Sequence, residues 1–185
     1  GAVFLNAGFK KHLLADTNPD LISLYHHVQN KGSDFAEYCQ SFFTPENNCE
    51  KRYYNFRKQF NSTSDLKYKS ALFLYLNRHC YNGLCRYNSK NKFNTPFGRY
   101  KNPYFPKKEL DAFYEVSKSA KFIHASFIDT MKKAKKGDVV YCDPPYVPLS
   151  ETACFTHYFS GGFSWKEQIE LAEWAGKLAK KGIPV

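Results

Sequence analysis

The stretch "GDVVYCDPPY", residues 137–146, decides the fold class because an apolar segment typical of a buried strand runs directly into two prolines. Proline has no backbone N–H to donate, and it pushes the residue before it toward extended geometry, so the strand has to end there. The result is a stiff corner at the carboxyl end of a strand, bearing the carboxylate of Asp143 and the ring of Tyr146. In open α/β sheets, ligands bind at this end of the strands.

Strand and helix patterns also alternate in the first part of the chain and just before the corner. Apolar runs at residues 10–16 and 120–126 favour strands, and the first run ends in Asp16. Between them, apolar residues from Leu21 to Val28 recur at i, i+3, i+4 and i+7, which predicts an amphipathic helix. Strands that alternate with helices are typical of an α/β fold with a parallel sheet.

The carboxyl-terminal part continues this alternation. Its long helix has clear end signals, because Ser164 and Glu167 have the spacing of a capping box and Gly182 is placed to end the helix. The segments expected here are a short basic helix over 129–135, a strand over 137–143, a helix over 164–182 and a further strand over 183–185.

Residues 26–106 differ in character, since they are rich in aromatic residues, asparagine and basic residues. A helical pattern over 70–77 is followed by Asn-Gly, Pro-Phe-Gly and Asn-Pro, which are turn signals. The segments 84–88 and 92–97 flank a basic stretch and predict a β-hairpin with a basic tip. This region therefore looks like a module inserted into the α/β sheet.

The composition favours a polyanionic partner. A formal net charge of +10 lets a protein neutralise phosphates and release their counterions. Tyr and Phe, at 14 and 17 copies, could supply stacking faces for bases, although a core rich in rings is the plainer explanation. The six cysteines lack the spacing of a zinc site, so we expect reduced thiols and no metal. Without a membrane-length apolar run or a signal-peptide pattern, we expect a cytoplasmic protein.

The corner at 143–146 has the groups needed to hold an exocyclic amine of a base. Asp143 and the carbonyl groups of the prolines can accept both amine protons, and Tyr146 offers a flat face for the ring. Such acceptors stabilise the positive charge that grows on the nitrogen during attack, which is the requirement for catalysis. A base in a duplex reaches such a pocket only when it is flipped out of the stack. The alternative is a plain turn after a strand.

Several segments together resemble the Dam family of DNA adenine-N6 methyltransferases, the group that modifies adenine in GATC. They are "GDVVYCDPPY" at 137–146, "LLADTNPDLISLY" at 13–25, "LFLYLNRHCYNGLCRYN" at 72–88 and "FNTPFGRYKNPYF" at 93–105. The resemblance implies a Rossmann-like S-adenosylmethionine-dependent methyltransferase sheet with an inserted helical and β-hairpin DNA-recognition domain. The catalytic domain would comprise 1–25 and 107–185, and the target-recognition domain 26–106.

The resemblance also implies roles for residues of the catalytic domain. Asp16 would bind the ribose hydroxyls of S-adenosylmethionine, although it could also be a helix cap or a solvated acid. Ser126 and Phe127 resemble the pair beside the cofactor adenine, with ordinary packing as the alternative. The implied catalytic residues are Asp143, Pro144, Pro145 and Tyr146, and the implied cofactor-binding residues are Asp16, Ser126, Phe127, Asp143 and Gly1.

In the recognition domain, the resemblance implies that Tyr81 wedges into the duplex beside the target base, while Asn82 touches the backbone. Leu84 and Pro96 would contact a thymine methyl group, and Arg86 would reach a guanine edge. A solvated surface role is the alternative for the polar residues that would contact phosphate. These phosphate-contacting residues are Arg57, Arg78, Asn88, Asn94 and Arg99.

The sequence departs from the family pattern at both ends. The family begins with an aromatic-Ala-Gly-Gly-Lys segment and a Pro-Phe-x-Gly-x-Gly loop, of which only the last part, residues 1–5, is matched. The central first strand and the strands expected after Val185 have no counterpart here. We therefore expect a chain cut at both ends, an incomplete sheet and weak cofactor binding.

The leading interpretation is a site-specific DNA adenine-N6 methyltransferase that uses S-adenosylmethionine and no metal, acts as a monomer on double-stranded DNA, and lies with the nucleoid rather than at a membrane. One alternative is a DNA-binding module that has lost catalysis, which would not need the sequence "DPPY". Another is an RNA methyltransferase on the same fold, although base-edge contacts presuppose a readable major groove.

Overall fold

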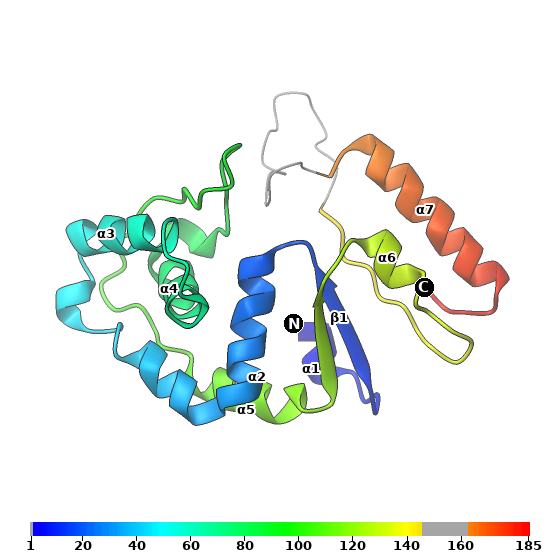
Figure 1. Cartoon of the computed structure of the whole chain (residues 1–185), viewed down its shortest axis with the longest axis horizontal. Helices are drawn as coiled ribbons and strands as arrows, with labels where there is room; N and C mark the ends of the chain where they lie inside the picture. The colour runs from blue at the N-terminus through cyan, green and yellow to red at the C-terminus, as the bar shows by residue number, and fades with distance from the viewer. Residues whose placement is uncertain (1, 146–162) are drawn as a thin grey trace.

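The computed structural model describes residues 2–145 and 163–185, and within them the protein is a mixed α/β structure (Figure 1). None of the helices in this described part is both long and apolar enough to span a membrane. In chain order, the elements are α1 (Ala2–Asn6), β1 (His12–Asp16), α2 (Pro19–Gln40), the 3-10 turn η1 (Pro45–Asn47), α3 (Glu50–Phe60), α4 (Leu66–His79), the 3-10 turn η2 (Tyr81–Gly83), α5 (Lys107–Ser117), β2 (Ala120–His124), α6 (Phe127–Met131) and α7 (Trp165–Lys180).

The two strands pair in parallel in the middle of the molecule (Figure 1). Both strands were predicted from their apolar runs, and both are confirmed. Their register places Asp16 opposite His124, so the carboxyl ends of β1 and β2 meet at one edge. The backbone N–H of Ala125 donates to the carbonyl oxygen of Asp16 at 3.2 Å, which carries the pairing one residue further.

Helix α2 connects this sheet to the rest of the core. It starts at Pro19, where the missing N–H costs nothing, and the side chain of Asn18 caps it by accepting from the N–H groups of Asp20 and Leu21. The helix is interrupted at Gly32, which has φ 47° and ψ −121°. A Cβ at this position would lie 3.0 Å from the ring of Tyr114, so both the backbone and the space require glycine.

Helix α4 is apolar on all sides in its middle, where residues 71–76 are all buried. A helix of this kind lies inside a core rather than on a surface. It packs against α2 and α3, and the same core extends to Phe113 of α5 and Phe122 of β2, whose rings stack at 5.7 Å. The expected domain boundary between residues 25 and 26 therefore falls inside α2 and inside one continuous core.

A second, smaller core lies under α7, which Figure 1 shows on the far side of the sheet from α3 and α4. Its buried residues are Met131, Leu178 and Ile183. The ends of α7 are as predicted, because Ser164 and Glu167 form a capping box and Gly182 follows the helix with φ 74°. The short helix expected over 129–135 is shifted, since α6 begins at Phe127 after the cap at Ser126.

The strands expected over 137–143 and 183–185 are not formed, which corrects the prediction. Among the described residues, these segments share one backbone hydrogen bond, from Val140 N–H to the carbonyl oxygen of Pro184 at 2.9 Å. A strand needs a ladder of such bonds on at least one side. The two segments lie side by side, as their apolar residues favour, but they lack the ladder of hydrogen bonds that a strand needs.

Candidate functional site

The carboxyl edge of the sheet brings together two of the residues predicted to bind cofactor. Asp16 ends β1 and is half-buried, and its partner on β2 is His124. Ser126 lies two residues beyond His124. Burial raises the pKa of the Asp16 carboxyl, while the N–H of Asn18, which donates to Oδ1 at 2.7 Å, acts in the opposite direction. A carboxylate held in this way has one oxygen fixed by the backbone and faces the end of the sheet where ligands bind.

Ser126 and Phe127 are engaged within the protein. Ser126 Oγ accepts from the N–H of Asp129 at 3.1 Å and donates to its Oδ2 at 2.8 Å, so it caps α6. The ring of Phe127 is half-buried, meets Phe163 edge-on at 5.8 Å and packs against the smaller core around Leu178. These contacts give both residues a packing role, and their predicted place beside the cofactor adenine stays a prediction.

The Asp-Pro-Pro corner leaves the smaller core with its acid exposed. Cys142 is half-buried in that core, Asp143 is exposed, and the carbonyl oxygen of Pro145 accepts from Gln168 Nε2 of α7 at 3.0 Å. The segment that leads into the corner rises to the same end of the molecule as the carboxyl ends of β1 and β2 (Figure 1). The corner is therefore anchored to α7 while its carboxylate faces outward.

Two predicted site residues, Gly1 and Tyr146, lie outside the described residues. Among the residues that are described, no three His, Cys, Asp or Glu side chains gather in a way that could hold a metal ion.

The predicted hairpin over 84–88 and 92–97 has one isolated bridge between its two arms rather than regular strands, and a second bridge joins its returning arm to Cys80. Cys80 pairs with Phe97, and Tyr87 pairs with Phe93, both antiparallel. The turn between them is tied by Asn88, whose N–H donates to the carbonyl oxygen of Lys92 at 2.9 Å and whose Oδ1 accepts from two backbone N–H groups beyond it. The predicted phosphate contact, Asn88, therefore holds the turn together from inside.

Tyr81 is the most prominent aromatic residue of this segment, because its side chain is 53% exposed on the turn η2. The turn is rigid: Tyr81 N–H donates to the carbonyl oxygen of Pro96 at 2.9 Å, and Asn82, at φ 51°, donates its N–H to the hydroxyl of Tyr100 at 3.0 Å. A ring presented on a fixed turn suits the wedge role that was predicted for Tyr81.

Arg86 is exposed and already oriented. Its Nε donates to Asn94 Oδ1 at 2.9 Å and its Nη2 donates to the carbonyl oxygen of the same residue at 3.3 Å. An arginine carries five N–H donors, so this pairing aims the guanidinium without exhausting its donors. The structure thus brings Arg86 and Asn94 together, as two of the residues predicted to contact DNA.

The other residues predicted to contact DNA differ in how many hydrogen bonds they form within the protein. Arg57 is half-buried below the loop, where Nη1 donates to the carbonyl oxygens of Asn94 and Thr95 at 3.2 and 2.9 Å, so it braces the loop. Arg78 lies over the ring of Tyr104, and its Nε donates to the carbonyl oxygen of that residue at 3.0 Å.

The remaining members of this predicted set lie along the same loop. Arg99 is exposed and pairs loosely with Glu50 at 3.6 Å. Pro96 is exposed, whereas Leu84 is half-buried and its carbonyl oxygen accepts from Thr95 Oγ1 at 2.7 Å.

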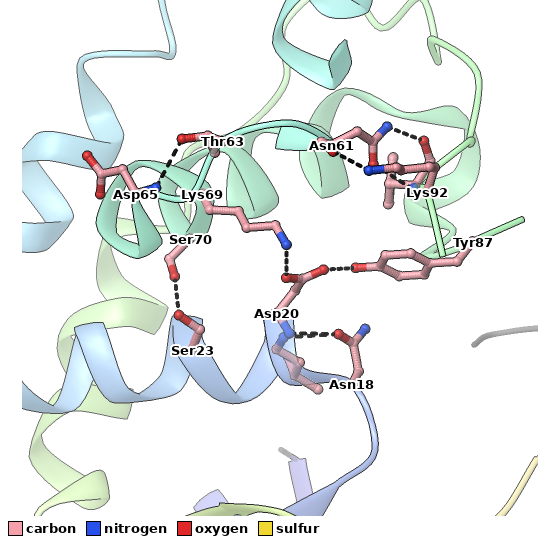
Figure 2. Close-up of polar contacts among 12 residues, drawn as sticks. Asn18, Asp20, Ser23, Asn61, Thr63, Asp65, Lys69, Ser70, Tyr87 and Lys92 are labelled. Carbon is pink, nitrogen blue, oxygen red and sulfur yellow. Dashed lines mark hydrogen bonds and ion pairs between the residues drawn. The ribbon is translucent and has the colours of Figure 1, made fainter. Parts of the chain in front are cut away.

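Sequence reasoning missed a buried polar network behind this loop, shown in Figure 2. Asp20 of α2 accepts from Tyr87 Oη at 2.8 Å and pairs with Lys69 Nζ at 2.7 Å. The only signal in the sequence was the "NPD" stretch at 18–20, which indicates a helix start but gives no information on distant partners.

The family model of the D12 class N6 adenine-specific DNA methyltransferase matches residues 1–185. The chain is 50% identical over 185 residues to a DNA adenine methylase of Escherichia coli (strain K12), and this match covers 100% of the chain and 66% of that protein. It is 49% identical over 186 residues to the DNA adenine methylases of Vibrio cholerae serotype O1 and Serratia marcescens, covering 67% and 69% of those proteins.

Proposed function

The chain belongs to the D12 class N6 adenine-specific DNA methyltransferases, and we propose that it transfers a methyl group from S-adenosylmethionine to N6 of an adenine flipped out of duplex DNA, within GATC. The observation that carries the proposal is the exposed carboxylate of Asp143, at the end of a corner that Gln168 anchors through Pro145. The relatives named DNA adenine methylase support the adenine specificity.

The chain's own residues would hold the adenine amine during transfer. The Asp143 carboxylate and the carbonyl oxygen of Pro144 accept its two N–H groups, which directs the nitrogen lone pair outward, and Tyr146 stacks on the base. As the nitrogen forms its new bond to carbon it becomes positively charged, and Asp143 stabilises that charge more than it stabilises the neutral amine. The bond between the methyl carbon and sulfur would break as the carbon–nitrogen bond forms, leaving a neutral thioether, and the surplus proton of N6 would pass to the Asp143 carboxylate.

The residues at the sheet edge fit a nucleoside cofactor. S-adenosylmethionine supplies an electrophilic methyl group on a sulfonium. Asp16 offers a carboxylate at the edge where nucleotide ribose groups bind in such sheets, with Oδ1 already oriented by the backbone of Asn18. Ser126 and Phe127 would lie beside the cofactor adenine, and Gly1 would approach its methionine end.

The opposite part of the protein would hold the duplex. A net charge of +10, the exposed ring of Tyr81 and the oriented guanidinium of Arg86 support this assignment. We assign residues 26–106 to target recognition, and 1–25 with 107–185 to a Rossmann-like catalytic domain. Such a protein would act as a monomer in the cytoplasm, with the nucleoid.

Substitution of Asp143 tests the proposal. In the protein expressed from its complete reading frame, Asp143→Ala should lower methyl transfer to a GATC duplex by at least about 100-fold, since a group aimed at transition-state charge is lost. Duplex affinity should be unchanged or slightly higher, because one negative charge has gone. Radiolabel incorporation and fluorescence anisotropy measure the two quantities.

Asp138→Ala is the matched control, because Asp138 is an exposed acid of the same segment whose carboxylate accepts from the N–H of Lys135 within its own turn. It should transfer at the unsubstituted rate. Retention of activity by Asp143→Ala would remove the corner from the mechanism. Normal duplex binding without any transfer by the unsubstituted protein would favour a binding module instead.

A further inference from the structure

The base-reading segment, residues 84–88, presents different residues on its two faces. Side chains alternate along an extended segment. Arg86 is exposed, whereas Tyr87 is buried and Cys85 is half-buried against the body of the protein. Whatever holds Cys85 and Tyr87 from behind therefore sets where the backbone of Arg86 lies, while Asn94 orients its guanidinium.

The contact behind Cys85 comes from the turn that follows β1. Asn18 donates its N–H to Asp16 Oδ1 at 2.7 Å and its Nδ2 to Cys85 Sγ at 3.6 Å. Burial raises the pKa of the Cys85 thiol to about 12, so the sulfur stays neutral near pH 7. One asparagine thus touches the predicted cofactor carboxylate on one side and the base-reading segment on the other.

The contact behind Tyr87 is stronger. Its hydroxyl donates to Asp20 Oδ2 at 2.8 Å, while Asp20 Oδ1 pairs with Lys69 Nζ at 2.7 Å (Figure 2). Asp20 is only 9% exposed and lies in the first turn of α2, where the helix dipole favours a negative charge. Burial raises the pKa of Tyr87, so its hydroxyl stays protonated and remains a donor.

The returning arm of the loop is held independently. Asn61 at the end of α3 accepts from the N–H of Phe93 at 2.8 Å and donates to its carbonyl oxygen at 3.0 Å. The ring of Phe93 meets Tyr87 edge-on at 5.8 Å. Because the returning arm is fixed to α3 and is also bonded to the outgoing arm at Leu84 and Asn88, loss of the Tyr87 hydroxyl bond should shift the outgoing arm without releasing the loop.

We propose that Asp20 and Tyr87 are positioning residues for sequence recognition, locking the base-reading segment onto the first turn of α2, just beyond the turn that carries Asp16, so that base choice at Arg86 depends on this buried bond. The inference rests on the proposed function for the role of Arg86. A hydrogen bond to a buried carboxylate contributes more free energy than one between neutral groups. Its loss at Tyr87 should therefore have a measurable effect on base discrimination by the adjacent Arg86.

The test uses duplex binding rather than transfer, so it stays valid whether or not the protein methylates. Dissociation constants are measured by anisotropy, with S-adenosylhomocysteine present, for a GATC duplex and for duplexes with one base pair replaced at a time. Tyr87→Phe should lower discrimination at the base pair read by Arg86 by roughly 5- to 20-fold, at or below the lower end of what a hydrogen bond to a charged group contributes, because Arg86 feels the loss indirectly. Arg86→Ala identifies that base pair and sets the maximum loss.

Tyr75→Phe is the matched control, because Tyr75 is also a buried tyrosine whose hydroxyl donates within the protein, to the carbonyl oxygen of Asn47 at 2.6 Å. It should lower thermal stability but leave discrimination unchanged. If Tyr87→Phe discriminates as the unsubstituted protein does, at a temperature where both are folded, the inference is overturned.

Asp20→Asn supplies a second variant that acts on the other side of the same bond. It should reduce discrimination at the same base pair, and the double variant with Tyr87→Phe should lose little more, because residues that act through one bond are not additive. Fully additive losses would show that the two residues act separately and would contradict the proposal. Absence of methyl transfer by the unsubstituted protein would count against the proposed function alone.

Discussion

His79 is a polar residue that the core accepts only in its neutral form. Its side chain is 1% exposed, stacks on Tyr75 at 3.8 Å, and shares a hydrogen bond of 2.8 Å between Nδ1 and the carbonyl oxygen of Tyr75. Burial lowers the pKa of His79 from 6.5 to about 4. The imidazole therefore remains uncharged while the protein is folded, with its proton on Nδ1.

This shift predicts how stability depends on pH. Between pH 6.5 and about 4 the unfolded chain binds a proton at His79 that the folded chain excludes, so the free energy of unfolding falls as the pH falls. The full contribution of this residue is about 3 kcal/mol, at no more than about 1.4 kcal/mol per pH unit. Urea unfolding at pH 7 and at pH 5 measures how much the free energy of unfolding falls between these two pH values.

His79→Asn is the comparison, because an asparagine amide can still donate to the carbonyl oxygen of Tyr75 but does not titrate. Its stability should depend less steeply on pH in this interval, with the contribution of the carboxyl groups unchanged. Equal slopes for the two proteins would mean that His79 is protonated in the folded state.

A residue's exposure agrees with its predicted role only at some of the predicted positions, and the roles themselves stay predictions. Arg86 and Tyr81 are exposed and oriented as their predicted roles require. Arg57 has the same chemistry as Arg86, yet it is half-buried and braces the backbone at 94–95. Which arginine points outward depends on packing between segments far apart in the chain, and a motif does not carry that information.

At the level of elements, the loop between α4 and α5 is held by many hydrogen bonds between its two arms. Gly98 lies where its two arms cross, with its N–H donating to the carbonyl oxygen of His79 at 2.8 Å. A Cβ on Gly98 would lie 2.7 Å from the carbonyl oxygen of Cys80 and 2.5 Å from the ring of Tyr100. The crossing needs glycine because a neighbouring backbone occupies the space.

Gly98→Ala should therefore displace the loop while the helical core remains folded. We expect the free energy of unfolding to fall by about 1 to 3 kcal/mol, as for other overpacked sites. The affinity for duplex DNA should fall by a larger fraction than the free energy of unfolding does. Thermal unfolding and anisotropy titration check the two effects.

Gly176→Ala is the control, since Gly176 is exposed within α7 and nothing lies within 4 Å of its Cβ position. It should stabilise the protein by up to about 1 kcal/mol and leave duplex binding unchanged. Full duplex affinity in Gly98→Ala would show that the crossing of the two arms does not shape the DNA-binding surface.

The elements that were predicted correctly have strong local signals. The caps at Ser164 and Glu167 fixed the start of α7, and the apolar runs fixed β1 and β2. The segment 137–143 also has an apolar run but forms no strand. A strand depends on a neighbouring strand, and the described part of this segment has one backbone hydrogen bond to its neighbour, from Val140 to Pro184. Periodicity predicts burial, whereas pairing is a property of the whole sheet.

On the scale of the whole molecule, the described chain has a large core around α2 and α4 and a small one under α7, with the two strands between them (Figure 1). The sequence predicted the α/β class, while the separate aromatic module stays a prediction, because its residues share one core with α2, α5 and β2. It did not predict the contacts of Asn18 with Cys85 and of Asp20 with Tyr87, because the partners in each pair lie 67 residues apart in the chain. These contacts join the turn after β1 and the first turn of α2 to the base-reading segment.

The central claim is that this arrangement methylates adenine at N6. The most direct measurement is mass spectrometry of nucleosides from a duplex with one GATC site, after incubation with S-adenosylmethionine and the protein expressed from its complete reading frame. We predict N6-methyladenine at that adenine, none in a duplex with the site scrambled, and none with Asp143→Ala. A duplex that is bound but left unmethylated, or methylated on cytosine, would contradict the account.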